Sequence, residues 1–342
     1  MQTKFLDAKK QKAAIDISAE ILRAGGIVGM PTETVYGLAG NALSEETVDK
    51  IFLAKGRPSD NPLIVHISNM ESWNELVSEL PEAAIALGEK FWPGPLTIIL
   101  PKSEKVPQRI CGTLSTVAVR MPKHKVALEL IEKAGFPLAA PSANTSGKPS
   151  PTTAKHVMDD LSGKIDAVLD GGECNIGVES TVLSLATEVP VIYRPGAITA
   201  EMLTEILGEV EISETVFAPL KEGEKVLSPG TKYKHYSPKG QVILVKGSFG
   251  DFLSYVKENA TEQDSVLCFD GEEEEFSIPV VTYGKKNDPS SQAKHIFDAL
   301  RKLDEMGSKK IFARMPDESG VGLAVFNRLA RAAAFNIVQT KE

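Results

Sequence analysis

The sequence predicts an α/β protein with two domains, and three observations support this prediction. The chain has 342 residues, about twice the length of an average domain. Short apolar runs typical of buried strands alternate with amphipathic stretches typical of helices, first within residues 1–208 and again within residues 239–342. Residues 209–238 between them lack this pattern, so we expect a linker or lid there, because an irregular stretch of that length is usually functional or disordered.

Glycine and proline mark the boundaries of the helices and strands predicted in residues 1–208. The first helix ends at Gly25, a helix stop. Ser44, followed by two acidic residues, begins the second helix, and Pro81 divides a longer apolar stretch into two helices. The helices are expected at 11–24, 44–56, 70–92, 124–135, 153–164 and 199–208. The strands are expected within 26–34, 62–67, 94–101, 115–122, 136–144 and 165–172, with a hairpin-like pair in 179–196.

The strand and helix pattern restarts after the linker. Strands are expected at 241–247, 264–270, 278–284 and 309–316, and helices at 251–260, 291–306 and 320–334. Such alternation is typical of a parallel sheet covered by helices on both faces. We therefore expect a smaller, Rossmann-like α/β domain at residues 239–342.

The composition argues against several classes of protein. The chain is 42% hydrophobic and 25% charged, as globular proteins are, and its net charge of −8 argues against a broad basic surface for nucleic acid. A local positive cleft for a small anion stays open. The three cysteines are far apart, the N-terminus has no apolar leader, and no apolar run approaches the ~20 residues that span a bilayer. We expect a cytoplasmic protein without a membrane partner.

Residues 55–66, KGRPSDNPLIVH, place two cations where a predicted helix ends at Gly56 and a loop that cannot be helical begins. Pro58 and Pro62 exclude a helix here, and a buried strand follows. Lys55 and Arg57 either complement the dipole of the preceding helix or bind a polyanion such as a triphosphate. This segment alone does not distinguish the two interpretations.

A second polar loop, residues 141–156 (PSANTSGKPSPTTAKH), lies between a predicted strand and a predicted helix. Open α/β sheets bind ligands where a strand ends and a helix begins. Ser142, Asn144 and Ser150 are therefore candidates to contact phosphate oxygens or a ribose. The alternative interpretation is a serine- and proline-rich surface loop.

Further cations and hydroxyls stand at the ends of other strands. Thr116 and Arg120 lie at opposite ends of strand 115–122, where an arginine after an apolar run needs a carboxylate or phosphate partner. Arg194 precedes a proline stop, and His66 either faces the same site or is a buried structural histidine. The sequence contains no Walker loop, nucleophile elbow or histidine metal motif. Cations and hydroxyls without an evident nucleophile favour phosphoryl or nucleotidyl transfer.

Several segments of the sequence resemble, in uninterrupted order, those of the YrdC-like family. Within roughly residues 10–207 they read PTETVYGLAGNA, KGRPSDNPLIVHI, WPGPLTIIL, STVAVRMPKH, PLAAPSANTSGKPSPT, DGG and GVESTVLSL followed by YRPG. The linker SPGTKYKHYSP and the α/β tail resemble the two-domain branch of that family, the L-threonylcarbamoyladenylate synthases.

The resemblance implies a fold and a reaction. The family fold is a twisted mixed α/β sheet with a positively charged concave face. The reaction is a nucleotidyl transfer in which L-threonine, bicarbonate and ATP give L-threonylcarbamoyl-AMP, pyrophosphate and water. A separate transferase complex then moves the threonylcarbamoyl group to the adenosine beside the tRNA anticodon, so contact of this chain with tRNA is expected to be weak or indirect.

The resemblance also implies site residues, carried over motif by motif. L-Threonine is expected to contact Thr34, His66, Arg120, Ala140 and Ser180, with its carboxylate on Arg120. ATP is expected to contact Lys55, Arg57, Asn61, Thr116, Ser142, Asn144, Ser150 and Arg194. The linker residues expected to close over the cleft are Tyr233, His235 and Tyr236. Mg²⁺ is expected to be held mainly by the ATP phosphates, without a dedicated protein cage.

Three alternatives stay open. The concave face could bind RNA as a simple binding module, although the net charge of −8 argues against that as the main role. A related carbamoyl-adenylate activity occurs in relatives with zinc-finger regions, and this chain has no Cys-x-x-Cys pair. A regulatory ATP-binding protein would bind ATP without releasing pyrophosphate.

Overall fold

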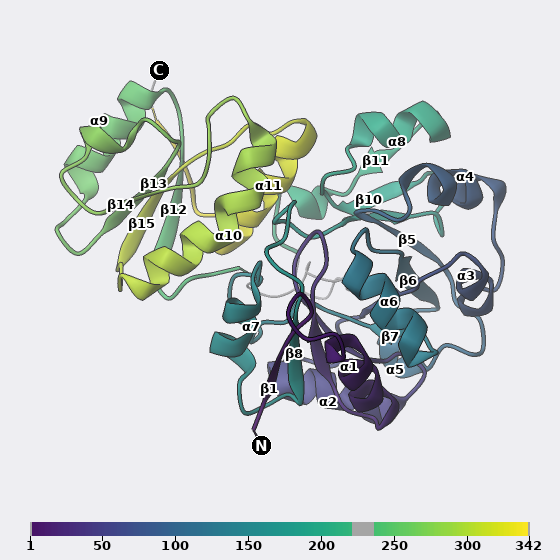
Figure 1. Cartoon of the computed structure of the whole chain (residues 1–342). Coiled ribbons are helices and arrows are strands. Elements are labelled where there is room, and N and C mark those ends of the chain that lie inside the picture. The colour runs from purple at the N-terminus through teal and green to yellow at the C-terminus, as the bar shows by residue number, and fades with distance from the viewer. Residues whose placement is uncertain (1, 221–235, 341–342) are drawn as a thin grey trace.

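The structure, a computed structural model, describes residues 2–220 and 236–340, and two sheets organise them (Figure 1). The first sheet has 11 strands of mixed direction. In spatial order these are β1 (Lys4–Asp7), β8 (Ala167–Asp170), β2 (Val28–Met30), β3 (Gly37–Asn41), β7 (Leu138–Ala139), β4 (Ile64–His66), β6 (Thr116–Arg120), β5 (Leu96–Pro101), β9 (Thr181–Ser184), β10 (Val191–Arg194) and β11 (Glu211–Ile212). The expected α/β class is confirmed.

Most helices of the first unit begin and end where the sequence signals them, but the short helix at residues 108–111 was not predicted. The helices are α1 (Ala14–Arg23), α2 (Glu45–Lys55), α3 (Glu71–Leu76), α4 (Glu82–Phe91), α5 (Gln108–Cys111), α6 (Lys125–Ala134), α7 (Ala154–Leu161) and α8 (Ala200–Leu207). The Ser44 side chain accepts a hydrogen bond from the backbone N–H of Thr47 and so caps α2. Gly56 ends that helix with a left-handed φ of 61°, as glycine does without strain. The chain then continues through the loop at residues 57–63 into strand β4.

Strand β3 was not predicted, because its sequence GLAGN is rich in glycine, which weakens strands. The packing explains it. A Cβ atom on Gly40 would lie 2.7 Å from the Cγ2 atom of Thr47, so only glycine lets α2 pack this closely against the strand. The short edge strand β1 was also missed; it exists because it pairs in parallel with β8.

The second sheet is entirely parallel, so the expected Rossmann-like unit is confirmed. In spatial order its strands are β14 (Val280–Thr282), β13 (Ser265–Cys268), β15 (Lys310–Arg314), β12 (Gln241–Lys246) and β16 (Ile337–Gln339). Its helices are α9 (Phe249–Asn259), α10 (Pro289–Glu305) and α11 (Gly320–Ala332), with 3₁₀ turn η2 (Glu273–Glu275). Only the edge strand β16 was missing from the prediction for this unit.

The expected linker, residues 209–238, contains regular structure at its start. Strand β11 pairs in parallel with β10, and the 3₁₀ turn η1 (Glu214–Val216) follows. Two of the predicted lid residues, Tyr233 and His235, lie outside the described residues. The domain boundaries at 208 and 239 stay predictions.

The two units share a hydrophobic cluster. Val35 and Val178 of the first unit pack in it with residues of α10 and α11, among them Phe297 and Leu323. Figure 1 shows α10 and α11 on the side of the second sheet that faces the first unit, with α7 below α10. None of the helices in residues 2–220 and 236–340 is both long enough and apolar enough to cross a bilayer.

Candidate functional site

A pocket in the first unit collects ten of the predicted site residues. They are Thr34, Arg57, His66, Arg120, Ala140, Ser142, Asn144, Ser180, Arg194 and Tyr236. The pocket is also lined by Thr32, Val35, Gly37, Pro62, Leu63, Ile64, Pro141 and Glu179. These residues come from segments spread over two hundred positions of the sequence, so the fold rather than the chain order brings them together.

The register of two neighbouring strands brings His66 and Arg120 side by side in this pocket. Strands β4 and β6 run parallel with His66 opposite Arg120, so both side chains stand where their strands end. The neighbouring strand β7 pairs with β4 in the opposite direction and leads into Ala140, whose backbone N–H donates to the carbonyl of Ile64 at 3.1 Å. The sheet therefore supplies a rigid floor for the site.

Arg120 is held by the turn that connects β2 and β3. Its Nη2 atom lies 2.5 Å from Oε1 of Glu33, and its Nη1 atom donates to the Thr34 hydroxyl at 2.8 Å. Both charged side chains are almost fully buried, at 3% and 6% exposure. The predicted need of Arg120 for an anionic partner is thus met by a carboxylate of the chain itself. Its predicted pairing with the threonine carboxylate stays a prediction.

His66 is a neutral imidazole in this site. Burial, and then the positive charge of Arg120, lower its pKa to about 3. Its Nδ1 atom lies 3.3 Å from the carbonyl oxygen of Ile64. At neutral pH His66 can therefore offer hydrogen bonds to a ligand, but no charge.

A second buried arginine, Arg194, is hydrogen-bonded to Ser180 in the wall of the pocket. Arg194, at the end of β10, donates to the carbonyl of Ser180 at 3.0 Å and to its hydroxyl at 3.1 Å. The Ser180 hydroxyl also lies 2.7 Å from the hydroxyl of Thr97. Arg194 and Arg120 thus place two guanidinium groups on one small pocket, which favours an anionic ligand.

Lys55 lies beneath the loop that carries Ser142 and Asn144, outside the pocket lining. Its ammonium group donates to the carbonyl oxygen of Ser142 and, at 2.7 Å, to that of Asn144. Burial, followed by repulsion from Arg57, lowers the pKa of Lys55 well below its usual value. The structure thus shows Lys55 shaping the loop, and its predicted contact with phosphate stays a prediction.

The loop after α2 supplies a cation and a buried amide. Arg57 donates through Nη2 to the carbonyl of Pro62 at 3.0 Å and lines the pocket. Asn61 is fully buried, and neither polar atom of its side chain has a hydrogen-bond partner among the described residues. Leaving a buried amide unsatisfied costs about 1–3 kcal/mol. Asn61 does not line the pocket, and its predicted contact with ATP stays a prediction.

Ser150 contacts the pocket through a carboxylate. Its hydroxyl donates to Oε1 of Glu179 at 2.5 Å, and Oε2 of Glu179 lies 2.9 Å from Nε of Arg328 in α11. Burial alone would raise the pKa of Glu179, but Arg328 and then Arg194 hold it below its usual value. Glu179 is therefore an ionised carboxylate in the pocket wall.

Sequence reasoning did not place Glu33, Glu179 or Arg328 among the site residues. Two of these had a signal in the sequence, since Glu33 and Glu179 lie within the family motifs PTETVYGLAGNA and GVESTVLSL. Arg328 had none, because its place in the site depends on how the second unit packs against the first.

Thr116 lies away from the pocket, whereas Tyr236 is part of its wall. Thr116 lies at the start of β6, at the opposite end of the strand from Arg120, and pairs with Pro101 outside the pocket lining. Its predicted contact with ATP stays a prediction. Tyr236 is buried in the pocket wall, with its ring centroid 5.1 Å from that of Phe297 in α10.

As to metals, the part of the chain that is described brings together no group of three or more His, Cys, Asp or Glu suited to an ion.

Comparison with known proteins identifies both units. A family model described as "Telomere recombination" matches residues 20–196, and one described as "Threonylcarbamoyl-AMP synthase, C-terminal domain" matches residues 198–334. The chain is 46% identical over 334 residues to the threonylcarbamoyl-AMP synthase of Pyrococcus abyssi, with 95% of each chain covered. It is 43% identical over 326 residues to the Bacillus subtilis protein of the same name, with 94% and 93% covered.

A solved structure resembles the whole chain. The crystal structure of P. abyssi Sua5 complexed with L-threonine superposes with a TM-score of 0.91 at 43% identity, and the match covers 100% of both chains. The similarity thus extends over both units and over their arrangement.

Proposed function

The chain belongs to the threonylcarbamoyl-AMP synthase family, and from that premise we propose that it makes L-threonylcarbamoyl-AMP from L-threonine, bicarbonate and ATP, with release of pyrophosphate. The observation that carries this proposal is the pocket of the first unit. It brings two buried arginines, a neutral histidine and several hydroxyls from separate segments to one place.

L-Threonine occupies the part of the pocket between Arg120 and Ser180. The relative of known structure is described as complexed with L-threonine, which supports this choice of substrate. Arg120 faces the substrate carboxylate, and the hydroxyls of Thr34 and Ser180 and the imidazole of His66 supply hydrogen bonds. The backbone of Ala140 lies beside them on the sheet floor.

ATP lies along the wall formed by Arg57, Ser142, Asn144 and Arg194. Arg57 and Arg194 neutralise phosphate charge, and the unsatisfied amide of Asn61 gains a partner when the nucleotide binds. Lys55 and Ser150 act from behind the pocket wall, through the loop and through Glu179. Thr116 belongs to this side only if the nucleotide extends to the far end of β6.

The reaction proceeds in two steps. The amine of L-threonine attacks the carbon of carbon dioxide or bicarbonate, and loses a proton, to form a carbamate; water leaves when bicarbonate is the donor. A carbamate oxygen then attacks the α-phosphorus of ATP in line, and pyrophosphate departs with the bonding electrons. The pocket contributes orientation and charge stabilisation rather than covalent chemistry. Tyr236 in the pocket wall shields the carbamate from water.

Magnesium accompanies the nucleotide. Mg²⁺ usually keeps several waters and binds substrate phosphates with few protein ligands, so it requires no cage of carboxylates in the chain. When bound it screens the triphosphate charge. The residues present fit this arrangement, because the predicted nucleotide wall offers arginines and hydroxyls for phosphate rather than clustered carboxylates for an ion.

The product passes to a transferase complex that modifies the adenosine beside the tRNA anticodon, in the cytoplasm. RNA binding by this chain alone is not favoured, because its net charge is −8. A salt titration of tRNA binding separates the two roles, since a true RNA-binding face gives a steep loss of affinity with salt.

Pyrophosphate release tests the proposal. We expect release only when L-threonine, bicarbonate and ATP are all present, and a product with the mass of threonylcarbamoyl-AMP. Release that does not depend on threonine would refute it, and ATP binding without any release would indicate a regulatory nucleotide-binding protein.

A further inference from the structure

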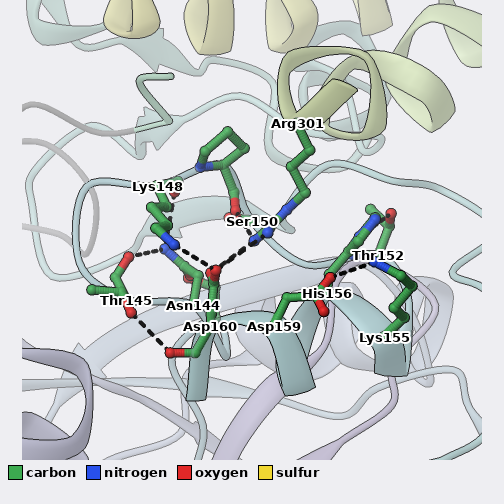
Figure 2. A network of polar contacts seen from close by, with 12 residues as sticks. Asn144, Thr145, Lys148, Ser150, Thr152, Lys155, His156, Asp159, Asp160 and Arg301 are labelled. Atoms are coloured by element: carbon green, nitrogen blue, oxygen red, sulfur yellow. Dashed lines mark hydrogen bonds and ion pairs between the residues drawn. The ribbon is translucent and has the colours of Figure 1, made fainter. Parts of the chain in front are cut away.

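Two helices of the second unit each send an arginine into the first unit. Figure 2 shows Arg301 reaching down from α10 to Asp160 of α7. Its Nη2 atom lies 2.9 Å from Oδ2 of Asp160 and donates to the carbonyl oxygen of Pro149 at 2.6 Å. Arg301 therefore ties a helix of the second unit to the polar loop at residues 141–156.

Asp160 contacts several residues of that loop, as Figure 2 shows. Its side chain is 1% exposed and also pairs with Lys148 at 3.0 Å, while its backbone carbonyl accepts the hydroxyl of Thr145 at 3.1 Å. Burial alone would raise the pKa of Asp160, but Arg301 and then Lys148 bring it below its usual value. A buried ionised carboxylate needs these partners. Among the described residues, removing Arg301 leaves the half-exposed Lys148 as the one remaining ion-pair partner of Asp160.

The loop held in this way continues directly into the pocket. The side-chain amide of Asn144, a lining residue, donates to the carbonyl oxygens of Thr145 and Lys148, both at 2.9 Å. A shift of residues 145–148 is thus passed to Asn144 by two hydrogen bonds.

Arg328 approaches the same loop from the other side. Its side chain is fully buried and pairs with Glu179, which accepts the hydroxyl of Ser150 at 2.5 Å. Arg328 also donates to the carbonyl of Pro195 at 2.7 Å, beside Arg194. The two arginines of the second unit thus converge on the consecutive residues Pro149 and Ser150.

We propose that Arg301 and Arg328 are positioning residues for ATP, through which the second unit sets the geometry of the nucleotide wall. The proposal rests on the proposed function, because it assumes that the wall carrying Asn144 and Arg194 binds the nucleotide. Neither arginine lines the pocket, so each acts through the residues it holds.

The test compares Arg301→Gln and Arg328→Gln with a matched control, Arg314→Gln. Arg314 is also ion-paired and is 4% exposed, between Arg328 at 0% and Arg301 at 11%. Its partner Glu272 belongs to the second unit, and neither residue lies at the pocket. ATP binding is measured by titration calorimetry with ATP and Mg²⁺, the KM values for ATP and L-threonine by pyrophosphate release, and stability by thermal unfolding.

We expect the Kd and KM for ATP to rise about tenfold in both test variants and to stay unchanged in the control. In Arg301→Gln the KM for L-threonine also stays unchanged, because the contacts of Arg301 end on the nucleotide loop. All three variants lower the melting temperature. If Arg328→Gln does not fold, Arg301→Gln decides the question.

Two results would overturn the proposal: an ATP Kd like that of the wild type in the folded test variants, or an equal rise in the control, which would indicate general loosening. The calorimetric Kd needs no turnover. A wild-type chain that binds ATP but releases no pyrophosphate therefore counts against the proposed function and leaves this test intact.

Discussion

The two sheets differ in what they do with the ends of their strands. The second sheet is of the parallel kind that often binds nucleotides at its carboxyl edge. At that edge Arg314 pairs with Glu272 at 3.2 Å, donates to the carbonyl of Gly247 at 2.9 Å, and lies over the ring of Phe269. The edge is thus occupied by the chain's own side chains.

The first sheet keeps polar groups turned toward an open pocket. Arg57, Arg120 and Arg194 line that pocket together. The comparison teaches that a fold of the kind that binds nucleotides does not by itself indicate where the ligand binds. In the proposed function the chemistry takes place at the first sheet, and the second unit is proposed to position that site through Arg301 and Arg328.

Arg120→Ala should give the largest effect. It leaves Glu33 buried without its cation, which costs about 3–5 kcal/mol of stability, and it removes the proposed partner of the threonine carboxylate. We expect kcat/KM for L-threonine to fall at least about a hundredfold, measured by pyrophosphate release. Arg314→Ala is the control: it should cost similar stability but leave kcat/KM of the folded protein unchanged. An equal fall of kcat/KM in both variants would contradict the claim that the two sheets differ in function.

Arg57→Ala comes next. Loss of this cation should remove about 2–4 kcal/mol of transition-state stabilisation, because it faces the phosphates in the proposed complex. The effect should appear in kcat/KM for ATP at saturating L-threonine. Threonine-dependent pyrophosphate release at the wild-type rate would show that the triphosphate lies elsewhere.

Asn61→Ala should give a smaller effect on ATP binding than Arg57→Ala. Its amide lacks a partner among residues 2–220 and 236–340, so its loss should cost little stability but weaken ATP binding by about 1 kcal/mol. Asn327→Ala is a suitable counterpart, because that buried amide donates to the carbonyl of Val216 at 2.9 Å. It should lower the unfolding temperature and leave the Kd for ATP unchanged; the reverse pattern would contradict the account.

The pH dependence of stability should show the smallest effect. The pKa of His66 is about 3 in the folded chain, against an ordinary value of 6.5, so below pH 6.5 the unfolded state binds a proton that the folded state does not. Stability is therefore full above pH 6.5 and falls as the pH drops toward 5, by at most about 1.4 kcal/mol per pH unit for this group. In His66→Gln the slope of the unfolding free energy over this range should become shallower. An unchanged slope would mean that His66 is not buried as described.

The sequence predicted elements whose signals are local. Ser44, Gly56 and Pro81 stand where the helix boundaries fall, and the hairpin-like pair in 179–196 is observed as antiparallel β9 and β10. Strands β1, β3, β11 and β16 could not be predicted in the same way. Three are short edge strands that exist through pairing, and β3 depends on the close approach of α2 to Gly40.

The same distinction applies to the site. Most residues carried over by motif line the pocket, because each motif lies at a strand end and the sheet gathers those ends. The buried partners Glu33 and Arg328 were missed, since an ion pair across 87 or 149 positions of the chain leaves no local pattern. Thr116, at the other end of its strand, shows that a motif residue can stand away from the pocket.

The most direct test of the central claim is a crystal structure of the chain with L-threonine and a non-hydrolysable ATP analogue. The account predicts threonine between Arg120 and Ser180, and the nucleotide along Arg57, Ser142 and Arg194, with no ligand at the carboxyl edge of the second sheet. A nucleotide seated beside Arg314, or bound ligands that leave these arginines of the first unit uncontacted, would contradict it.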